Sequence, residues 1–278
     1  MKFSLIMATY GRSNEIRNFL ISLKNQTYKN FELIVIDQNE DEKAYKVIKE
    51  FENDFEVKCF KVNFKGLSKA RNYGMNYISG DIIAFPDDDC EYPSNLLENV
   101  RSFFEKNSRY HILCVFAIDK NNNKESLGRW FKSSKNIYIT NFMRVCPSPC
   151  LFIRNNERFY FDENFGLNSK YKSSEEMDLI FRLLKKGYKG YFERNLFIYH
   201  PYKENSKERA YYYGIGMGAF FRKHLKSDFK LLFPFVENLI IRPIGGMILN
   251  GITLRKEKFF KNLYGFIGRW KGFVSYDN

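Results

Sequence analysis

Three adjacent carboxylates, Asp87-Asp88-Asp89, are the first group of residues in this chain that could do chemistry. Their negative charges repel one another, so the bare cluster is unfavourable unless a cation offsets it. Mg²⁺ and Mn²⁺ take carboxylate oxygens as ligands, and a divalent metal site is therefore the functional interpretation. The alternative is an acidic turn that is simply solvated, and the neighbouring sequence has to decide between the two.

A second acidic group combines Glu175, Glu176 and Asp178 at the predicted start of a helix. A carboxylate in a site can accept a proton from a reacting hydroxyl. The alternative is structural, because Ser173 and Glu176 have capping-box spacing and acids at a helix start complement its dipole. Capping does not explain three acids within four residues beside the aromatic segment 159–172, which reads as a long loop over a cleft.

The element that must position the first acids is the apolar run Ile82–Phe85, which follows Gly80. The run does not alternate and is rich in β-branched residues, which is typical of a buried strand. Pro86 would end its ladder. The acids then lie just past the carboxyl end of the strand, where open α/β sheets bind ligands, and this position favours the metal site.

The preceding sequence predicts three more strands separated by helices. The strands are expected at Phe3–Ala8, Glu32–Ile36 and Val57–Val62, and the helices from Ser13 or Asn14, over Asp41–Phe51 and over Gly66–Tyr77. This alternation predicts an α/β fold with a mostly parallel central sheet flanked by helices.

Polar side chains recur at the strand ends and helix starts of this half. They are Thr9, Arg12, Asp37, Arg71, Asp87 and Asp89. Six such residues on one rim describe a cleft with basic groups for phosphate and acidic groups for metal and ribose. The helix dipole disfavours a cation where Arg71 lies, which a bound diphosphate would explain. For Arg71 alone, a surface arginine is the alternative.

The second half continues with short elements and ends at a histidine. The sequence predicts a helix over Ser94–Lys106, strands at Ile112–Ile118 and Leu151–Arg154, a helix that stops at Gly187, and short strands at Tyr188–Phe192 and Leu196–Tyr199 before His200-Pro201.

The composition is that of a folded, basic protein. The 278 residues carry a net charge of +13 and are 44% hydrophobic, which excludes a disordered chain and suggests an anionic partner. The five cysteines are odd in number and lack metal-site spacing, so reduced thiols in the cytoplasm are expected. No signal peptide is recognised at the N-terminus.

The composition changes after His200. The stretch Leu231–Leu254 is apolar but interrupted by prolines, glycines and charges, so we expect an interfacial or re-entrant helix pair and no clear transmembrane helix. Basic and aromatic residues alternate in Arg255–Lys271, which is typical of helices on anionic membrane surfaces. The alternative is a helical cap on the catalytic domain.

Together these residues resemble the inverting glycosyltransferases of family 2, which have the GT-A fold. The resemblance covers about residues 1–201. It rests on an ordered series of motifs: Ala8-Thr9-Tyr10-Gly11-Arg12, Val35-Ile36-Asp37, Gly66-Leu67-Ser68-Lys69-Ala70-Arg71-Asn72, Asp87-Asp88-Asp89 as the Asp-X-Asp motif, Phe161-Asp162-Glu163 with Phe165-Gly166, and Glu175-Glu176 with Asp178.

The resemblance implies a donor site for a nucleotide sugar, and the expected nucleotide is UDP. Four residues would cradle its uracil and ribose: Thr9, Tyr10, Arg12 and Asp37. Arg71 would approach the nucleotide. Asp87 and Asp88 would border the ribose and sugar, and Asp89 would ligate the Mn²⁺ or Mg²⁺ that bridges the phosphates.

The resemblance also implies a catalytic base. The family motif usually reads Glu-Asp, with the second acid as base; Glu176 holds that position here, and Glu175 is the neighbouring candidate. Some related enzymes use a histidine after this helix as a further metal ligand, and His200 lies in a suitable place. A purely structural role for His200 is the alternative.

The implied activity is metal-dependent, inverting transfer of a sugar to a hydroxyl of a saccharide acceptor, expected to be lipid-linked, in bacterial surface polysaccharide synthesis. The expected domains are a GT-A catalytic domain over 1–201, with nucleotide-binding and acceptor halves dividing near residue 90, and a helical region over 202–278. The expected location is the cytoplasmic face of the cell membrane.

Two other activities use similar parts. A nucleotidyltransferase would share the sheet, the metal and the nucleotide, but usually has a glycine-rich basic loop after the first strand, which residues 9–12 do not form. A basic nucleic-acid-binding protein would need stacking aromatics on a strand platform or a basic stripe. The acidic cluster would repel a phosphate backbone, so no nucleic-acid partner is expected.

Overall fold

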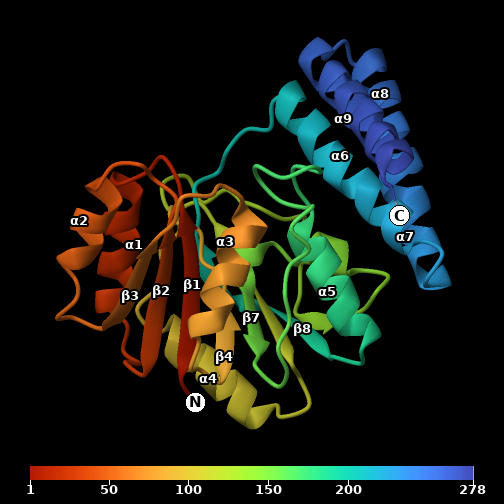
Figure 1. Ribbon diagram of the computed structural model, residues 1–278. Helices are drawn as coiled ribbons and strands as arrows, with labels where there is room; N and C mark the ends of the chain where they lie inside the picture. Colours follow the sequence, from red (N-terminus) through yellow and green to blue (C-terminus); the bar gives the residue numbers. More distant parts are fainter. Residues whose placement is uncertain (278) are drawn as a thin grey trace.

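The computed structural model describes residues 1–277 and is built on one central sheet (Figure 1). Its strands are β1 (Phe3–Thr9), β2 (Phe31–Asp37), β3 (Glu56–Lys61), β4 (Ile82–Ala84), β5 (Ile112–Ile118), β6 (Lys135–Ile137), β7 (Leu151–Arg154) and β8 (Gly190–Tyr199). They form an 8-stranded sheet in the order β3-β2-β1-β4-β7-β5-β8-β6.

Most strands of the sheet point the same way. β1 pairs in parallel with β2 and β4, and β2 with β3. β7 is antiparallel to both β4 and β5, while β5 and β8 are parallel to each other. The carboxyl ends of β1, β2, β4, β5 and β8 therefore meet at one edge, so the predicted mostly parallel sheet is confirmed.

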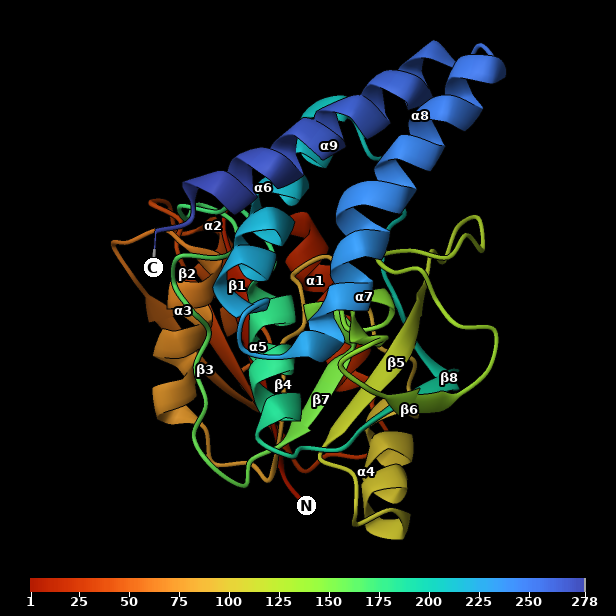
Figure 2. The ribbon, with the colours of Figure 1, turned by 90° about the vertical axis from the view of Figure 1, so that its right-hand side faces the viewer.

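Helices cover both faces of the sheet. The helices of the first two hundred residues are α1 (Asn14–Lys24), α2 (Lys43–Lys49), α3 (Leu67–Gly74), α4 (Leu96–Lys106) and α5 (Glu175–Lys185). Figure 2 shows α3 and α5 on one side of the sheet and α4 on the other. The core between them is formed by the central strands, which are buried; all seven residues of β2, for example, are buried.

The predicted elements differ from the structure at a few places. The two strands expected between Tyr188 and Tyr199 are one strand, β8, whose pairing with β5 shifts register between Val115 and Phe116. No pattern predicts β6, because its three residues contain no apolar run and form only the sheet edge. The other predicted helices and strands of the catalytic half are confirmed within a few residues.

The chain ends in a group of helices that pack on one another beyond the sheet (Figure 1). They are α6 (Lys207–His224), α7 (Leu232–Phe235), a π-helical turn (Val236–Ile241), α8 (Arg242–Ile252) and α9 (Lys256–Ser275). Glycines let α6 and α9 approach closely: a Cβ on Gly218 would lie 1.9 Å from the carbonyl oxygen of Arg269. The glycines of α6 thus serve helix packing.

The apolar stretch after α6 is continuous and not interrupted. Within residues 1–277, Phe229–Ile252 is one helical segment of 24 residues, long and apolar enough to cross a membrane by length and composition alone. This corrects the expectation that prolines and glycines break the stretch. Pro243 is accommodated in the first turn of α8, where a missing N–H does least harm, directly after the π-helical turn.

We predict that Gly218→Ala destabilises the protein by about 2 kcal/mol, because the added methyl group overpacks the α6–α9 contact. Gly245→Ala is the matched control: its Cβ meets nothing within 4 Å, and alanine is the better helix former by up to about 1 kcal/mol. Urea unfolding of both variants measures the difference. Equal stability of Gly218→Ala and the parent chain would contradict this helix packing.

Candidate functional site

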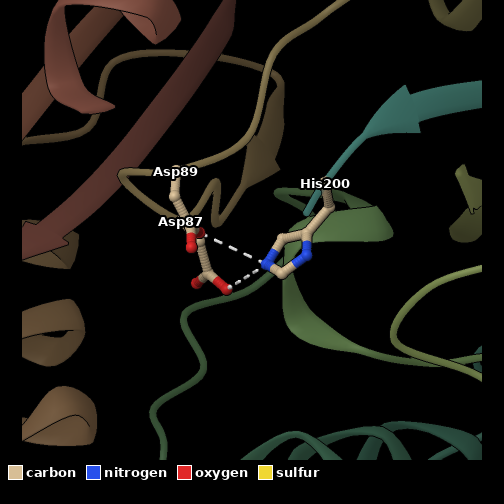
Figure 3. Close-up of side chains that lie close together, drawn as sticks. All are labelled: Asp87, Asp89 and His200. Atoms are coloured by element: carbon tan, nitrogen blue, oxygen red, sulfur yellow. Dashed lines mark ion pairs between the residues drawn. The ribbon is translucent and has the colours of Figure 1, made fainter. Parts of the chain in front are cut away.

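Three predicted site residues meet at the carboxyl edge of the sheet. Asp87 and Asp89 follow β4, and His200 follows β8 (Figure 3). Nε2 of His200 lies 3.3 Å from Asp89 Oδ1 and 3.7 Å from Asp87 Oδ2. One ligand atom from each residue lies within 4.8 Å of the others. Two carboxylates and an imidazole form a donor set that suits Mn²⁺ or Mg²⁺, so these residues fit the expected metal.

The surroundings of this cluster favour positive charge between the carboxylates. Burial lowers the pKa of His200, but its hydrogen bonds to Asp87 and Asp89 outweigh burial and raise the pKa to about 9. Burial raises the pKa of Asp89, yet hydrogen bonds from His200 and Lys203 hold that pKa well below its usual range. Nζ of Lys203 also contacts Asp89 Oδ2. The cluster therefore holds an ionised carboxylate ready for a cation.

Asp88 faces the first strand of the sheet. Thr9 donates its hydroxyl to Asp88 Oδ2 at 2.8 Å, and the Arg12 guanidinium contacts Oδ1 of the same carboxylate. Arg12 also lies 3.0 Å from Asp89. Burial raises the pKa of Asp88 to about 6 despite these partners. The structure thus brings Thr9, Arg12 and the three acids together, as the rim argument predicts.

Asp37 ends β2 on the same edge and is fully buried. Its Oδ1 accepts hydrogen bonds from the backbone and side-chain nitrogens of Asn39, at 2.9 and 2.7 Å. Its Oδ2 is buried without a hydrogen-bond partner within residues 1–277. Tyr10 follows Thr9, the strand partner of Asp37, and is 47% exposed under the ammonium of Lys65. An unpartnered buried carboxylate oxygen is unfavourable alone and suits a ligand that donates hydrogen bonds.

Arg71 is buried, with 2% of its surface exposed, so the surface-arginine interpretation is wrong. It donates to Glu175 Oε1 at 3.2 Å and to Asp87 Oδ1 at 3.3 Å. Its guanidinium also lies over the rings of Phe85 and Phe161. One side chain therefore joins the acids after β4 to the acids that begin α5.

The start of α5 does not form the capping box that its spacing allows. The helix begins at Glu175, and the preceding Ser174 has φ +72° and makes no side-chain capping bond. Glu175 is buried against Arg71, whereas Glu176 keeps some contact with solvent. Desolvation and the neighbouring Glu175 raise the pKa of Glu176 well above its usual value. A carboxylate with a raised pKa is a stronger base than an ordinary glutamate.

The aromatic loop before α5 packs on α3. Ser68 donates to the carbonyl of Phe165 at 2.6 Å, and Asn72 donates to the carbonyl of Phe161 at 3.0 Å. Gly166 has φ +100°, and a Cβ there would lie 2.8 Å from Ser68 Oγ. The predicted long loop is thus confirmed as a segment without strand or helix that is held against the site.

The third acid of the second group, Asp178, has a different environment from Glu176. It is fully buried and accepts from Arg182, Lys223 and His224 at 2.8, 2.6 and 2.7 Å. Burial raises its pKa, but the hydrogen bond with His224 and the charges of Arg182 and Lys223 outweigh burial and lower the pKa below its usual range. Asp178 therefore attaches α6 to α5.

Sequence reasoning missed three residues that the structure brings to the site. Lys203 contacts Asp89, Ser148 accepts from Arg71 at 3.0 Å, and Lys223 reaches Asp178 from α6. Each lies on a segment whose position depends on tertiary packing, and none belongs to a motif. The three-residue distance from His200 to Lys203 was the one available signal, since both follow β8.

Comparison with known protein families gives a match over more than half of the chain. Residues 4–172 match the sequence model of glycosyl transferase family 2. The match covers the first strands, the Asp87–Asp89 motif and the loop before α5. It favours sugar transfer over the nucleotidyltransferase and nucleic-acid-binding alternatives.

Two curated relatives differ in how much of their length the chain covers. The UDP-Glc:alpha-D-GlcNAc-diphosphoundecaprenol beta-1,3-glucosyltransferase WfgD of Escherichia coli is 28% identical over 261 residues, which are 93% of this chain and 96% of that protein. An uncharacterized glycosyltransferase of Rickettsia bellii is 36% identical over 107 residues, 38% of this chain and 16% of that protein.

A solved structure shares the fold. The mannosyltransferase PcManGT from Pyrobaculum calidifontis, in complex with GDP-Man and Mn²⁺, aligns with a TM-score of 0.66 and 10% sequence identity. The alignment covers 99% of this chain and 87% of that chain. The predicted GT-A fold is therefore confirmed.

We predict that Asp178→Asn lowers the free energy of unfolding by about 3 kcal/mol at pH 7, because it leaves the half-buried cations of Arg182 and Lys223 without their buried carboxylate partner. The folded-state pKa of Asp178 is depressed, so its stabilisation is present above the pKa of an unfolded aspartate, about 4, and is lost as the pH falls below it. Urea unfolding from pH 7 down to pH 3 should show the difference between the variant and parent shrinking.

Asp54→Asn serves as the matched control for this pH series. Asp54 pairs with Lys24 at 3.0 Å on the surface, and its removal should change stability by less than about 1 kcal/mol. A difference between Asp178→Asn and the parent that grew as the pH fell would contradict the proposed ionisation of Asp178.

Proposed function

The chain belongs to glycosyl transferase family 2, and on that premise we propose that it transfers a hexose from a UDP-sugar to a hydroxyl of a polyprenyl-diphosphate-linked saccharide, with inversion and with a divalent metal. The observation that carries the proposal is the Arg71 bridge. Because Arg71 contacts both Asp87 and Glu175, the residues proposed for the donor and those proposed for proton transfer lie one side chain apart.

The proposed donor site uses the carboxyl ends of β1, β2 and β4. Asp37 has a buried oxygen that would accept a hydrogen bond from the uracil or ribose, and Tyr10, which follows the strand partner of Asp37, offers an exposed ring. Arg12 and Lys203 bring cations to the acids after β4, where they would meet the diphosphate. Asp87 and Asp88 would border the ribose and the sugar.

Asp89 is the proposed principal metal ligand, with Asp87 and His200 beside it. When bound there, Mn²⁺ or Mg²⁺ would neutralise the negative charge that develops on the leaving diphosphate. Metal binding requires a neutral imidazole, so the metal would replace the proton that His200 holds between the two carboxylates.

Glu176 is the proposed catalytic base. The acceptor hydroxyl is too weak an acid to ionise at neutral pH and needs a carboxylate to take its proton in the transition state. The acceptor oxygen then forms its bond to the anomeric carbon as the bond to UDP breaks, and the proton goes to Glu176. Because attack and departure occur on opposite faces of the sugar, one displacement inverts the anomeric centre. Glu175 is held by Arg71 and would orient the helix start.

The relative WfgD supports the proposed substrates, because its name specifies a UDP-glucose donor and a diphosphoundecaprenol-linked acceptor. Its similarity extends over 93% of this chain, so it reaches into the C-terminal helices. A lipid-linked acceptor would bring the enzyme to the cytoplasmic face of the membrane and place it in surface polysaccharide synthesis.

We predict that Glu176→Gln lowers kcat at least 100-fold, since general-base catalysis contributes about that much or more. Glu176→Asp should keep measurable activity, because it preserves the carboxylate. UDP release from UDP-glucose in the presence of MnCl₂ and a diphosphoundecaprenol-linked N-acetylglucosamine measures both variants. If Glu176→Gln kept the parent's kcat, the base assignment would be wrong.

UDP with MnCl₂ should raise the melting temperature of the parent chain, because a ligand that binds only the folded state stabilises it. The gain should be several degrees for the parent and should be lost in Asp89→Asn. Polyuridylic acid is the control ligand. Equal stabilisation by polyuridylic acid, or an unchanged response of Asp89→Asn, would count against the proposed site.

A further inference from the structure

The helical segment Phe229–Ile252 carries an exposed apolar stripe along its length. Phe229, Phe233, Ile248 and Ile252 are 82%, 65%, 58% and 77% exposed. The other large exposed apolar residues of the segment are Leu232, Ile241, Ile244 and Leu249. Isolated exposed apolar residues are ordinary, but a continuous row over a whole helix marks an interaction surface.

The opposite side of the same segment is already occupied. Phe235 packs between Phe221 of α6 and Phe273 of α9, with ring centroids 5.5 and 5.6 Å away. Asn238 is buried and accepts a hydrogen bond from Arg129 of the catalytic half at 2.9 Å. The middle of the segment is therefore attached to the rest of the protein, and the stripe is the side that remains free.

The π-helical turn keeps the stripe on one side. In an uninterrupted α-helix, the eight residues from Phe233 to Ile241 would carry Ile241 about 80° around the axis. The wider turns over Val236–Ile241 reduce this rotation, and both residues remain exposed. From Ile241 onward, residues 244, 248 and 252 follow at helical spacing.

Cations accompany the stripe. Residues 226–261 contain seven, which are Lys226, Lys230, Arg242, Arg255, Lys256, Lys258 and Lys261. The same residues contain three acids, which are Asp228, Glu237 and Glu257. Lys226 and Lys230 are exposed at one end of the segment, and Arg255, Lys256 and Lys258 are exposed just beyond the other end. An apolar row with cations at both ends is complementary to an anionic lipid surface.

We propose that Phe229–Ile252 lies in the plane of the membrane interface, with the stripe in the apolar boundary and the cations on anionic lipid head groups. The segment is about 36 Å long and could cross a bilayer by length alone. Crossing would separate Asn238 from Arg129, and would place Asn238 and the Glu237–Arg242 pair in hydrocarbon, which is costly. A second copy of the chain fits the stripe less well than a lipid surface does, because two stripes in contact would bring their flanking cations together.

The biological role of this membrane attachment rests on the proposed function, since a lipid-linked acceptor lies at the same membrane surface. The docking itself depends only on the stripe and its cations. Figure 2 shows the segment starting beside α5 and projecting beyond the sheet to the far end of α8, where α9 begins. The catalytic half would therefore be held beside the membrane by a helix that does not leave the protein.

The first experiment measures binding of the full chain to vesicles of phosphatidylglycerol and phosphatidylethanolamine. The double variant Phe233→Glu with Ile248→Glu should bind at least tenfold more weakly than the parent. Ile21→Glu is the matched control, because Ile21 is an exposed residue on α1, outside the stripe. Unchanged vesicle binding by the double variant would overturn the proposal.

The shift in melting temperature with UDP and MnCl₂ separates this proposal from the proposed function. The double variant should keep the parent's response, because the changed residues lie outside the site. Loss of vesicle binding with a normal UDP response supports the docking surface. A parent chain that binds vesicles but does not respond to UDP would contradict the proposed function. Its vesicle binding would still support the stripe as the docking surface.

The second experiment measures depth in the bilayer. Spin labels at Phe233→Cys, Ile241→Cys and Ile248→Cys are placed singly in a chain with Cys59→Ser, because the other four cysteines are buried. Collision with oxygen and with a water-soluble nickel chelate should give the same shallow depth at all three positions. A label at 241 that is much deeper than the other two would show a spanning helix and overturn the proposal. Labels shielded from both reagents in a dimer would overturn it in favour of a second copy.

Discussion

The buried guanidinium of Arg71 is the constraint on which the site depends. Removing a charge from water costs several kcal/mol unless partners replace the water. Arg71 obtains those partners from Asp87 after β4 and Glu175 at the start of α5, with the rings of Phe85 and Phe161 on its faces. Helix α3, the segment after β4 and the start of α5 must therefore fold together. Their contact brings the proposed donor residues next to the proposed base.

A second charged cluster extends this constraint to the C-terminal helices. Asp178, three residues after Glu175, is buried against Lys223 and His224 of α6. α6 in turn packs so closely on α9 that glycines are required at their contact. The helix that carries Glu176 and the segment that carries the apolar stripe are therefore joined through α6, whose Phe221 packs on Phe235. The proposed membrane surface and the proposed catalytic base thus share one framework.

Much of the catalytic half could be predicted from the sequence, because its signals are local. The apolar runs before Thr9, Asp37 and Asp87 identify strands, and parallel strands bring their carboxyl ends to one edge. The meeting of Asp87, Asp89 and His200 agrees with that reasoning. The partners of Arg71 could not be predicted, since Glu175 is 104 residues away and only tertiary packing joins them. For the same reason no pattern indicates Lys223, and only its closeness in sequence to His200 indicates Lys203. The sequence pattern predicts an interruption within Phe229–Ile252 because Pro234 and Pro243 count against a helix, whereas a helix start and a π-helical turn accommodate them.

The anomeric configuration of the product tests the central claim most directly. The parent chain, given UDP-α-glucose, MnCl₂ and a diphosphoundecaprenol-linked N-acetylglucosamine, yields a disaccharide whose anomeric proton can be observed by NMR after release from the lipid. A single displacement assisted by Glu176 predicts the β-linked product alone. An α-linked product would contradict the account, because it would require retention of configuration and a different use of the two acids that begin α5.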